Sequence, residues 1–152
     1  MLKPDPRAMS PRTDGDGDTL VEDLSNFASW LPSEMAQDLD STMTATKALR
    51  EVLGGFHSLQ ASKSASKLEA TFITDSKHQY VVGFDDLSDG QRQLCALYFV
   101  QHLVMKPGRL LILDEPDNYV ALREIQPWLL EALDLALSEN GPQLCLSVTI
   151  PS

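Results

Sequence analysis

The stretch that decides the fold begins with FDDLSDGQR at residues 84–92, continues through an apolar run, and ends with LLILDEPDN at residues 110–118. Ser88 can act as the N-cap of a helix, and Gln91, three residues later, completes a capping box. Gly90 has no Cβ, so a bound group could come close to the backbone there. The first amides of a helix lack internal partners and the helix dipole is positive at that end. This stretch therefore predicts an anion site suited to a phosphate.

The second part of the stretch predicts a buried strand that ends in two carboxylates. Residues 110–113 form a continuous apolar run, which is typical of a parallel strand covered on both faces. Asp114 and Glu115 then fall at the carboxyl end of this strand, where ligands bind in open α/β sheets. Adjacent strand residues point opposite ways, so the two acids need not share a role. One can hold Mg²⁺, directly or through water, while the other accepts a proton from an attacking water.

Each of these two patterns also has a simpler interpretation. A Ser-x-x-Gln sequence before an apolar run is usually just the start of a helix. An Asp-Glu-Pro sequence after an apolar strand is more often a solvated turn than a metal site. Ligand binding is favoured because both patterns occur in one chain, in this order, separated by a single apolar helix.

Together the motifs resemble those of the ABC-type P-loop ATPases, most closely the AAA, SMC-, RecF- and OLD-like branch. Residues 87–92 are similar to the signature motif of that family, which is usually Leu-Ser-Gly-Gly-Gln. Residues 110–115 resemble the Walker B strand with its catalytic Glu. Residues 116–120 resemble the D-loop that follows, which would contain Asp117 and Asn118. The resemblance implies a partial P-loop NTPase fold, the ABC-ATPase head.

The resemblance also implies roles for single residues. Two heads of this family sandwich ATP, and each head gives its signature motif to the other. Ser88, Gly90 and Gln91 would then contact the γ-phosphate of ATP that is bound to a partner. Asp114 would position Mg²⁺, and Glu115 would act as the catalytic residue that activates water for ATP hydrolysis, but only if a phosphate-binding loop were supplied to the same lobe.

Two parts of the family pattern are missing from this sequence. No Gly-x-x-x-x-Gly-Lys-Ser/Thr occurs, so the Walker A loop that binds the β- and γ-phosphates is absent. Residues 147–152 contain no histidine at the place of the switch histidine. The resemblance runs from about residue 20 to the end, so we expect the C-terminal part of such an ATPase, whether natural, truncated or decayed.

These absences leave two functions open. In the first, the chain is a module of a composite ATPase site, and ATP and Mg²⁺ bind only with a Walker A-bearing partner or a missing segment that supplies this loop. The expected partner is a Walker A-bearing ATPase lobe or a second copy. In the second, it is a non-catalytic module for dimerisation or protein interaction, derived from such an ATPase. The retained Glu115 weighs against the second function, because a purely structural copy has no need for that base.

The sequence before the decisive stretch predicts a leader, helices and a hairpin. Residues 1–19 are rich in Pro and Gly and are predicted to be a flexible leader with little to bury. Apolar spacing predicts one helix over 20–31, ended by Pro32, and a second over 33–53, within a helical segment 20–57. Residues 58–66 are polar and predict a loop. Alternation over 67–84 predicts a β-hairpin ahead of the signature helix.

The region 85–152 is predicted to form the signature and Walker B lobe. Its elements are an apolar helix over 88–105, the strand at 110–113, a helix over 121–138 kinked or restarted at Pro127, and a strand over 143–150.

Composition narrows the class of protein further. Apolar residues make up 43% of the 152 residues and charged residues 22%, as in ordinary globular domains. The net charge of −10 argues against direct binding of nucleic acid, and no apolar run is long enough to span a membrane. Cys95 and Cys145 lie in apolar patterns, which predicts buried free thiols and fits the reducing cytoplasm.

Overall fold

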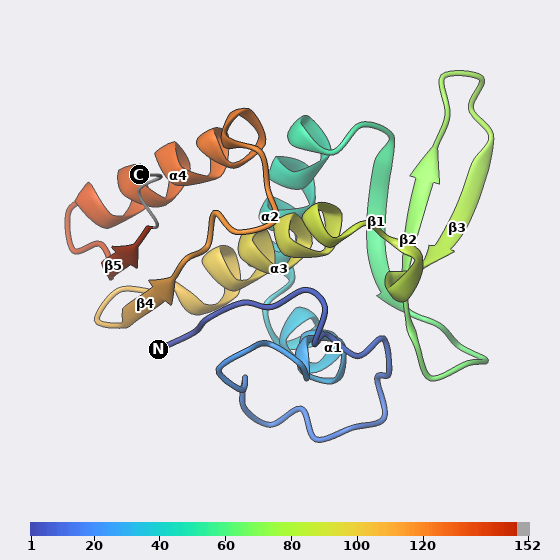
Figure 1. Cartoon of the computed structure of the whole chain (residues 1–152), viewed down its shortest axis with the longest axis horizontal. Helices are drawn as coiled ribbons and strands as arrows, with labels where there is room; N and C mark the ends of the chain where they lie inside the picture. Colours follow the sequence, from blue (N-terminus) through green and yellow to red (C-terminus); the bar gives the residue numbers. More distant parts are fainter. Residues whose placement is uncertain (149–152) are drawn as a thin grey trace.

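The computed structural model describes residues 1–148. An antiparallel sheet lies at one end of the molecule and a parallel pair of strands at the other, with helix α3 running between them (Figure 1). The elements in chain order are α1 (Phe27–Gln37), α2 (Leu39–Val52), β1 (Phe56–Ala61), β2 (Leu68–Ile73), β3 (Gln79–Gly83), a 3₁₀ turn (Phe84–Asp86), α3 (Asp89–Val104), β4 (Leu110–Asp114), α4 (Leu122–Leu137) and β5 (Gln143–Ser147). The predicted α/β class, with a small parallel sheet, flanking helices and a β-hairpin, is confirmed.

Strands β4 and β5 pair in parallel, as the helix–strand–helix–strand order predicts. Their register runs from Leu110 opposite Gln143 to Asp114 opposite Ser147. A parallel pair needs a crossover connection, and α4 supplies it. The register brings the carboxyl ends of both strands to the same edge, so Asp114 and Ser147 lie side by side there.

The crossover helix follows its prediction closely. Pro127 lies inside α4 and does not restart it. It falls in the second turn, where the missing N–H removes only one helical hydrogen bond. The final strand was predicted over 143–150, and β5 ends at Ser147. Residues 149–150 lie outside the described residues.

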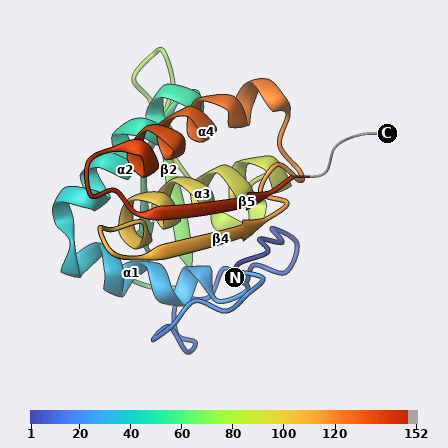
Figure 2. The ribbon, with the colours of Figure 1, turned by 90° about the vertical axis from the view of Figure 1, so that its left-hand side faces the viewer.

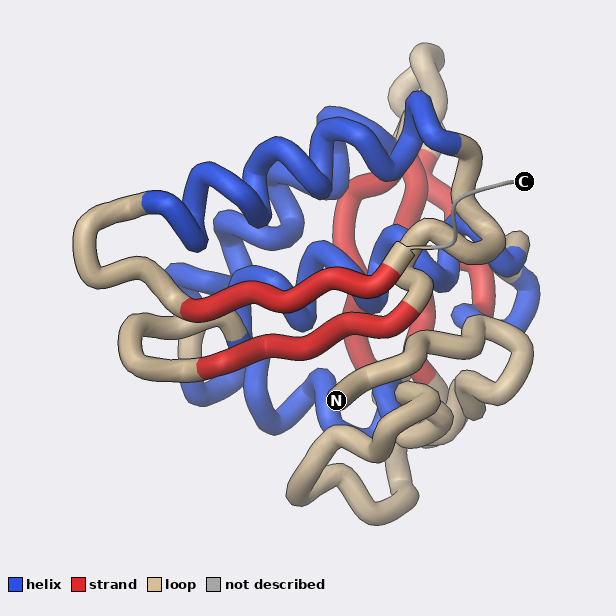
Figure 3. Tube along the Cα trace, turned by 60° about the vertical axis from the view of Figure 1, so that its left-hand side comes forward, coloured by secondary structure: helices blue, strands red, loops and turns tan. Residues whose placement is uncertain are grey.

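Only one face of the parallel pair is covered. Leu111 and Leu113 are 5% and 0% exposed, whereas Leu110 is 56% exposed and Cys145 on β5 is also exposed. Figures 2 and 3 show the helices on one side of β4 and β5. Coverage of residues 110–113 on both faces and burial of the Cys145 thiol were therefore wrong predictions. In the described part of the chain, the helices pack on a single face of this pair.

Helix α3 is buried on every side, as predicted for residues 88–105. Helices α1, α2 and α4 all contact it. Although α3 is 16 residues long and largely apolar, no helix among residues 1–148 has both the length and the apolar character to cross a membrane. Its buried residues are Gln93, Leu94, Cys95, Ala96, Leu97, Tyr98, Phe99, Val100, Gln101 and Leu103.

The first two helices divide at a different residue from the predicted one. The prediction placed helices at 20–31 and 33–53, separated by Pro32. In the structure α1 begins later, contains Pro32 and continues beyond it. The break falls at Asp38, whose side chain accepts a 3.0 Å hydrogen bond from the amide of Ser41 and caps α2. Asp38 starts a new helix because its side chain caps the first turn of α2. Pro32 does not end α1, because the φ of proline is compatible with a helix and its missing N–H removes only one hydrogen-bond donor.

The sheet around the predicted hairpin has a third strand. Strands β2 and β3 pair antiparallel, which confirms the hairpin at 67–84. Strand β1 pairs with β2 where the sequence suggested the end of a helical segment and a polar loop. Phe56 and Leu59 are buried at 4% and 1% exposure, three residues apart, because a bulge shifts the register between Phe56 and Ser58. The bulge breaks the two-residue alternation by which strands are recognised.

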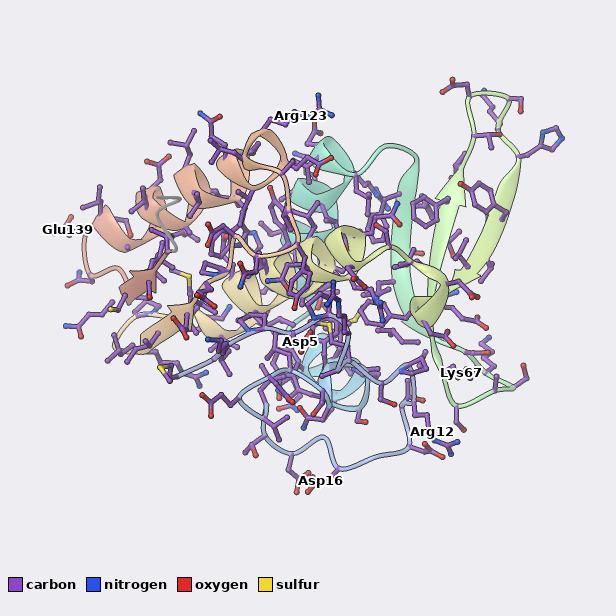
Figure 4. All side chains as sticks on the ribbon, in the orientation of Figure 1. Asp5, Arg12, Asp16, Lys67, Arg123 and Glu139 are labelled. Atoms are coloured by element: carbon purple, nitrogen blue, oxygen red, sulfur yellow. The ribbon has the colours of Figure 1, made fainter. Side chains whose placement is uncertain are left out.

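Residues 1–19 contact the rest of the chain at several points. Met9 is only 3% exposed, so the expectation that this segment has little to bury is wrong there. Arg12 forms an isolated antiparallel bridge with Lys67, and Figure 4 shows the two residues close together. Leu2 forms a parallel bridge with Leu113 on the outer edge of β4. The sheet edge that carries the acid pair is therefore covered by the start of the chain.

Helices α3 and α4 also meet at a buried histidine. The His102 side chain is 8% exposed, and its Nε2 lies 3.0 Å from Oε1 of Glu131, although not at a hydrogen-bonding angle. Burial lowers the pKa of His102 from 6.5 to about 4, with a smaller effect from Lys106. Burial raises the pKa of Glu131. His102 is therefore neutral in the folded protein at pH 7.

We predict that His102 makes the protein less stable in mild acid. The unfolded chain protonates His102 near pH 6.5 and the folded chain only near pH 4. Because the unfolded state binds this proton first, protonation favours unfolding. The free energy of unfolding is therefore unaffected by His102 above pH 6.5 and decreases as the pH falls from 6.5 to 4. The loss should reach at most about 3 kcal/mol. Urea unfolding at a series of pH values measures it. His102→Gln should flatten the slope between pH 6.5 and 4, and an unchanged slope in that variant contradicts the assignment.

Candidate functional site

The start of α3 has the predicted capping geometry. The Ser88 hydroxyl oxygen accepts a 3.2 Å hydrogen bond from the amide of Gln91, and the Gln91 side chain accepts a 3.0 Å hydrogen bond from the amide of Ser88. Ser88 itself is exposed. The amide of Arg92 donates to the Ser88 carbonyl. The amides of Gln91 and Arg92 are thus already used by Ser88. The amides left for an anion at this helix start are those of Asp89 and Gly90, because the first turn of a helix has no internal acceptors for them.

Gly90 faces the loop that follows β4. A Cβ built at Gly90 would lie 2.9 Å from the carbonyl oxygen of Tyr119, closer than real Cβ contacts allow. The sequence suggested that this glycine admits a bound group. The structure adds a second reason for it, since the loop backbone already lies against the helix at this position. Helix α3 and the loop after the acid pair are thus in direct contact.

The two acids leave the strand in an unexpected way. Asp114 is the last residue of β4, and Glu115 adopts a φ of +50°. Such a conformation costs a residue with a Cβ about 1–3 kcal/mol. The amide of Glu115 donates a 2.7 Å hydrogen bond to the carbonyl of Ser147, which holds this turn against β5. Because Glu115 is no longer extended, the strand rule that adjacent side chains point apart does not apply to this pair.

Both acids instead reach one cation, Lys3. The Lys3 ammonium lies 3.0 Å from Oδ2 of Asp114 and 3.2 Å from Oε2 of Glu115. Hydrogen bonds to Asp114 and then Glu115 raise the pKa of Lys3. Hydrogen bonds from Lys3 and then Ser147 lower the pKa of Asp114. Sequence reasoning missed Lys3, because nothing in its local sequence connects it with residues far along the chain.

Of the two predicted D-loop residues, Asn118 contacts Glu115. The Asn118 side-chain amide donates a 3.1 Å hydrogen bond to Oε2 of Glu115, the same oxygen that contacts Lys3. Oδ1 of Asp117 is buried without a hydrogen-bond partner. The fully buried Gln93 of α3 donates a 3.1 Å hydrogen bond to the carbonyl of Pro116. This bond ties the loop to α3 and places Asn118 beside the catalytic candidate.

Two arginines neutralise the acid beside the helix start. Arg7 contacts Asp89 at 3.1 Å and Arg92 contacts it at 2.6 Å. These two contacts, Arg7 first, lower the pKa of Asp89. The Arg7 guanidinium also lies over the Tyr119 ring, 4.9 Å from its centroid. A carboxylate at this position would repel a phosphate, and the paired arginines reduce that repulsion.

A pocket of about 570 Å³ opens beside Lys3 and Asn118. Asp5, Glu22 and Asp23 also line it, so the pocket itself is acidic and suits a cation better than a phosphate. Ser88 and Gly90 are not among its lining residues. Asp114 and Glu115 do not line it either. The pocket therefore adjoins the acid pair only through Lys3 and Asn118, which contact those carboxylates.

The acid pair fits a magnesium ion only as part of a ligand set. Among residues 1–148, no three or more His, Cys, Asp or Glu side chains converge as a metal site. Mg²⁺ is commonly held by one or two protein carboxylates, with waters and substrate phosphates completing the shell. The ammonium of Lys3 shows that Asp114 and Glu115 can share one cation. The donor set therefore fits Mg²⁺ that arrives with a nucleotide.

Comparison with known families gives the class of this protein. It is an AAA-type, ATPase-related domain. The family model described as "AAA domain, putative AbiEii toxin, Type IV TA system" matches residues 5–147, and the chain belongs to this family. The AAA ATPase part of the resemblance drawn from the sequence is thereby confirmed. A search of curated proteins found no match.

We predict that Gly90→Ala destabilises the protein by about 1–2 kcal/mol, although alanine is the better helix former. The added Cβ would press on the Tyr119 carbonyl, and backbone yields less readily than a side chain. Gly54→Ala is the matched control, because a Cβ added at Gly54 would meet no other part of the protein within 4 Å. Urea unfolding compares the two variants. Equal stability of the two would show that Gly90 does not pack tightly against the loop.

Proposed function

We propose that this chain supplies one half of a composite ATPase site of the ABC type. The observation that carries the proposal is the contact between the two sequence motifs. The capped start of α3 meets the loop after β4 at Gly90 and Tyr119, and the acid pair at the end of β4 converges on a single cation. An anion site and a cation site at neighbouring ends of a helix and a parallel strand suit a nucleotide with its metal.

In this proposal each residue has a defined task. Ser88 and the first amides of α3, with Gln91 holding the cap, contact the γ-phosphate of ATP bound by the partner. Asp114 holds Mg²⁺, which neutralises developing phosphate charge when it is bound. Glu115 accepts a proton from the attacking water, and its hydrogen bond from Asn118 orients the carboxylate. The protein contributes positioning and charge, which are the main requirements of phosphoryl transfer.

The partner must supply what this sequence lacks. A Walker A loop binds the β- and γ-phosphates through backbone amides and a lysine, and no such motif occurs in this chain. We propose that a Walker A-bearing lobe completes the site, because a second copy of this sequence would lack the same motif. ATP and Mg²⁺ then bind at the junction rather than to this chain alone. With a net charge of −10, the chain is not expected to contact nucleic acid itself.

A second candidate function is a non-catalytic interaction module. It is favoured by the outer face of α4, where Leu130, Leu133 and Leu137 are 56%, 46% and 83% exposed. Their spacing places them on one side of the helix, away from the buried Ile125 and Trp128. An exposed apolar stripe of this kind can bind another protein without any nucleotide.

We predict that the isolated chain releases no phosphate from ATP. The proposed contacts reach only the γ-phosphate, the metal and the water, and none anchors the α- and β-phosphates. The measurement is phosphate release from ATP with and without Mg²⁺, using Glu115→Gln as the control. Mg²⁺-dependent turnover that disappears in Glu115→Gln would overturn the composite-site proposal.

We predict that mixing the chain with a Walker A-bearing ATPase lobe produces an ATP-dependent dimer that Ser88→Arg abolishes. Ser88 is exposed, so the substitution should cost only about 1 kcal/mol of capping energy while blocking the phosphate. Glu115→Gln should prolong the dimer, because ATP stays uncleaved. Light scattering with and without ATP measures assembly. Ser64→Arg, in the exposed loop between β1 and β2, is the matched control.

The same measurement separates the two functions. A dimer that forms without ATP, resists Ser88→Arg and is lost in Leu133→Glu would support the interaction module. A dimer that requires ATP and Ser88 but tolerates Leu133→Glu would support the composite ATPase site.

A further inference from the structure

The first residues of the chain form a strap across the candidate site, defined here as residues 2–7. Leu2 joins the outer edge of β4 through two backbone hydrogen bonds of 2.8 Å, one to the carbonyl of Ile112 and one from the amide of Asp114. The amides of Lys3 and Asp5 donate to the carbonyls of Glu22 and Asp23, at 2.7 and 3.0 Å. The strap is therefore held on both sides by backbone bonds.

The register of the strap places Lys3 at the acid pair. Leu2 bonds to the amide of Asp114, so the next residue of the strap falls beside the end of β4. The ammonium of Lys3 then contacts both Asp114 and Glu115. These are the two carboxylates that the proposed function assigns to Mg²⁺ and to the attacking water. Lys3 thus contacts both acids at once.

The other end of the strap reaches the second half of the site. Arg7 contacts Asp89 at the start of α3, and its guanidinium lies over the ring of Tyr119. Tyr119 belongs to the loop whose carbonyl lies against Gly90. The two cationic side chains of the strap therefore contact the helix start, the D-loop segment and the acid pair.

We propose that the strap is a built-in inhibitor of the acid pair, in which Lys3 occupies the place of a divalent cation. This inference rests on the proposed function, because it takes Asp114 and Glu115 as a cation site. A divalent ion bound to the same two oxygens would lie within a few ångströms of the Lys3 ammonium and repel it. Metal binding and docking of Lys3 are therefore mutually exclusive.

The strap can be released because its ion pairs are exposed. The Lys3 side chain is 51% exposed and that of Arg7 is 68% exposed, and such pairs are screened by water and salt. A divalent ion carries twice the charge of the ammonium and competes well for the two carboxylates. When Lys3 leaves the acid pair, the backbone hydrogen bonds between Leu2 and β4 weaken. The rest of the strap, including Arg7 at Asp89, then becomes easier to displace. Entry of the metal would thus prepare the site for a nucleotide-bearing partner.

The test is the binding of Mn²⁺ alone to the full chain, measured by electron paramagnetic resonance. Lys3→Met keeps the length of the side chain and removes the competing charge, so Mn²⁺ should bind roughly tenfold more tightly than to the parent. Lys63→Met is the matched control, because Lys63 is exposed in the loop between β1 and β2. It removes the same charge and should change the affinity less than about twofold. Equal gains in the two variants, or no gain in Lys3→Met, would refute the strap proposal.

Two further measurements distinguish failure of the strap from failure of the proposed function. Asp114→Asn in the Lys3→Met background should abolish the tight Mn²⁺ binding. Retained binding would show that Asp114 is not the cation ligand, which overturns both the metal assignment and the strap. Hydrogen exchange of the Leu2 amide should speed up when Mg²⁺ is added to the parent. If Asp114→Asn weakens binding to the parent while Lys3→Met has no effect and Leu2 stays protected, the strap fails and the cation site stands.

Discussion

The structure depends on the burial of one helix. Helix α3 is enclosed by α1, α2 and α4, and its side chains from Leu94 to Val100 are each at most 4% exposed. Full burial leaves only its ends available for function, and the amino end emerges beside the loop after β4. Gln93, buried at that end, bonds to the carbonyl of Pro116 and fixes the loop against the helix. The position of the candidate site follows from this packing, because buried residues of α3 determine where the start of that helix meets the loop after β4.

The carboxylates of the candidate site are paired with cationic side chains. The chain carries a net charge of −10, yet the site carboxylates Asp89, Asp114 and Glu115 each lie against a cationic side chain. The cations come from two sources, Arg92 on α3 itself and Lys3 and Arg7 from the start of the chain. Arg92 and Asp89 both belong to α3, whereas Lys3 and Arg7 belong to the strap. These contacts offset the repulsion between carboxylates at an acidic edge of the protein.

Sequence reasoning worked where the physical cause was local. The capping box at Ser88 and Gln91 depends on two residues three positions apart, and the structure contains both of its hydrogen bonds. The parallel pairing of β4 and β5 follows from apolar runs joined by a helix. Reasoning from the sequence failed at Pro32, which the helix tolerates, and at β1, whose bulge hides the strand alternation. The first error came from the rule that proline ends a helix, and the second from the rule that strand residues alternate between buried and exposed. Both rules describe common local behaviour that the three-dimensional structure can override.

The sequence by itself determined the elements from β2 to β5 and the order of the motifs, because helix caps, apolar periods and strand ends depend on neighbours a few residues apart. Only the tertiary structure decided which charges meet. Lys3 lies more than a hundred residues before Asp114, and the contact exists because Leu2 bonds to the edge of β4. Likewise, the positive φ of Glu115 turns its carboxylate toward the cation shared with Asp114. Backbone pairing between distant segments has no local signature, so these contacts could not be predicted from any single stretch.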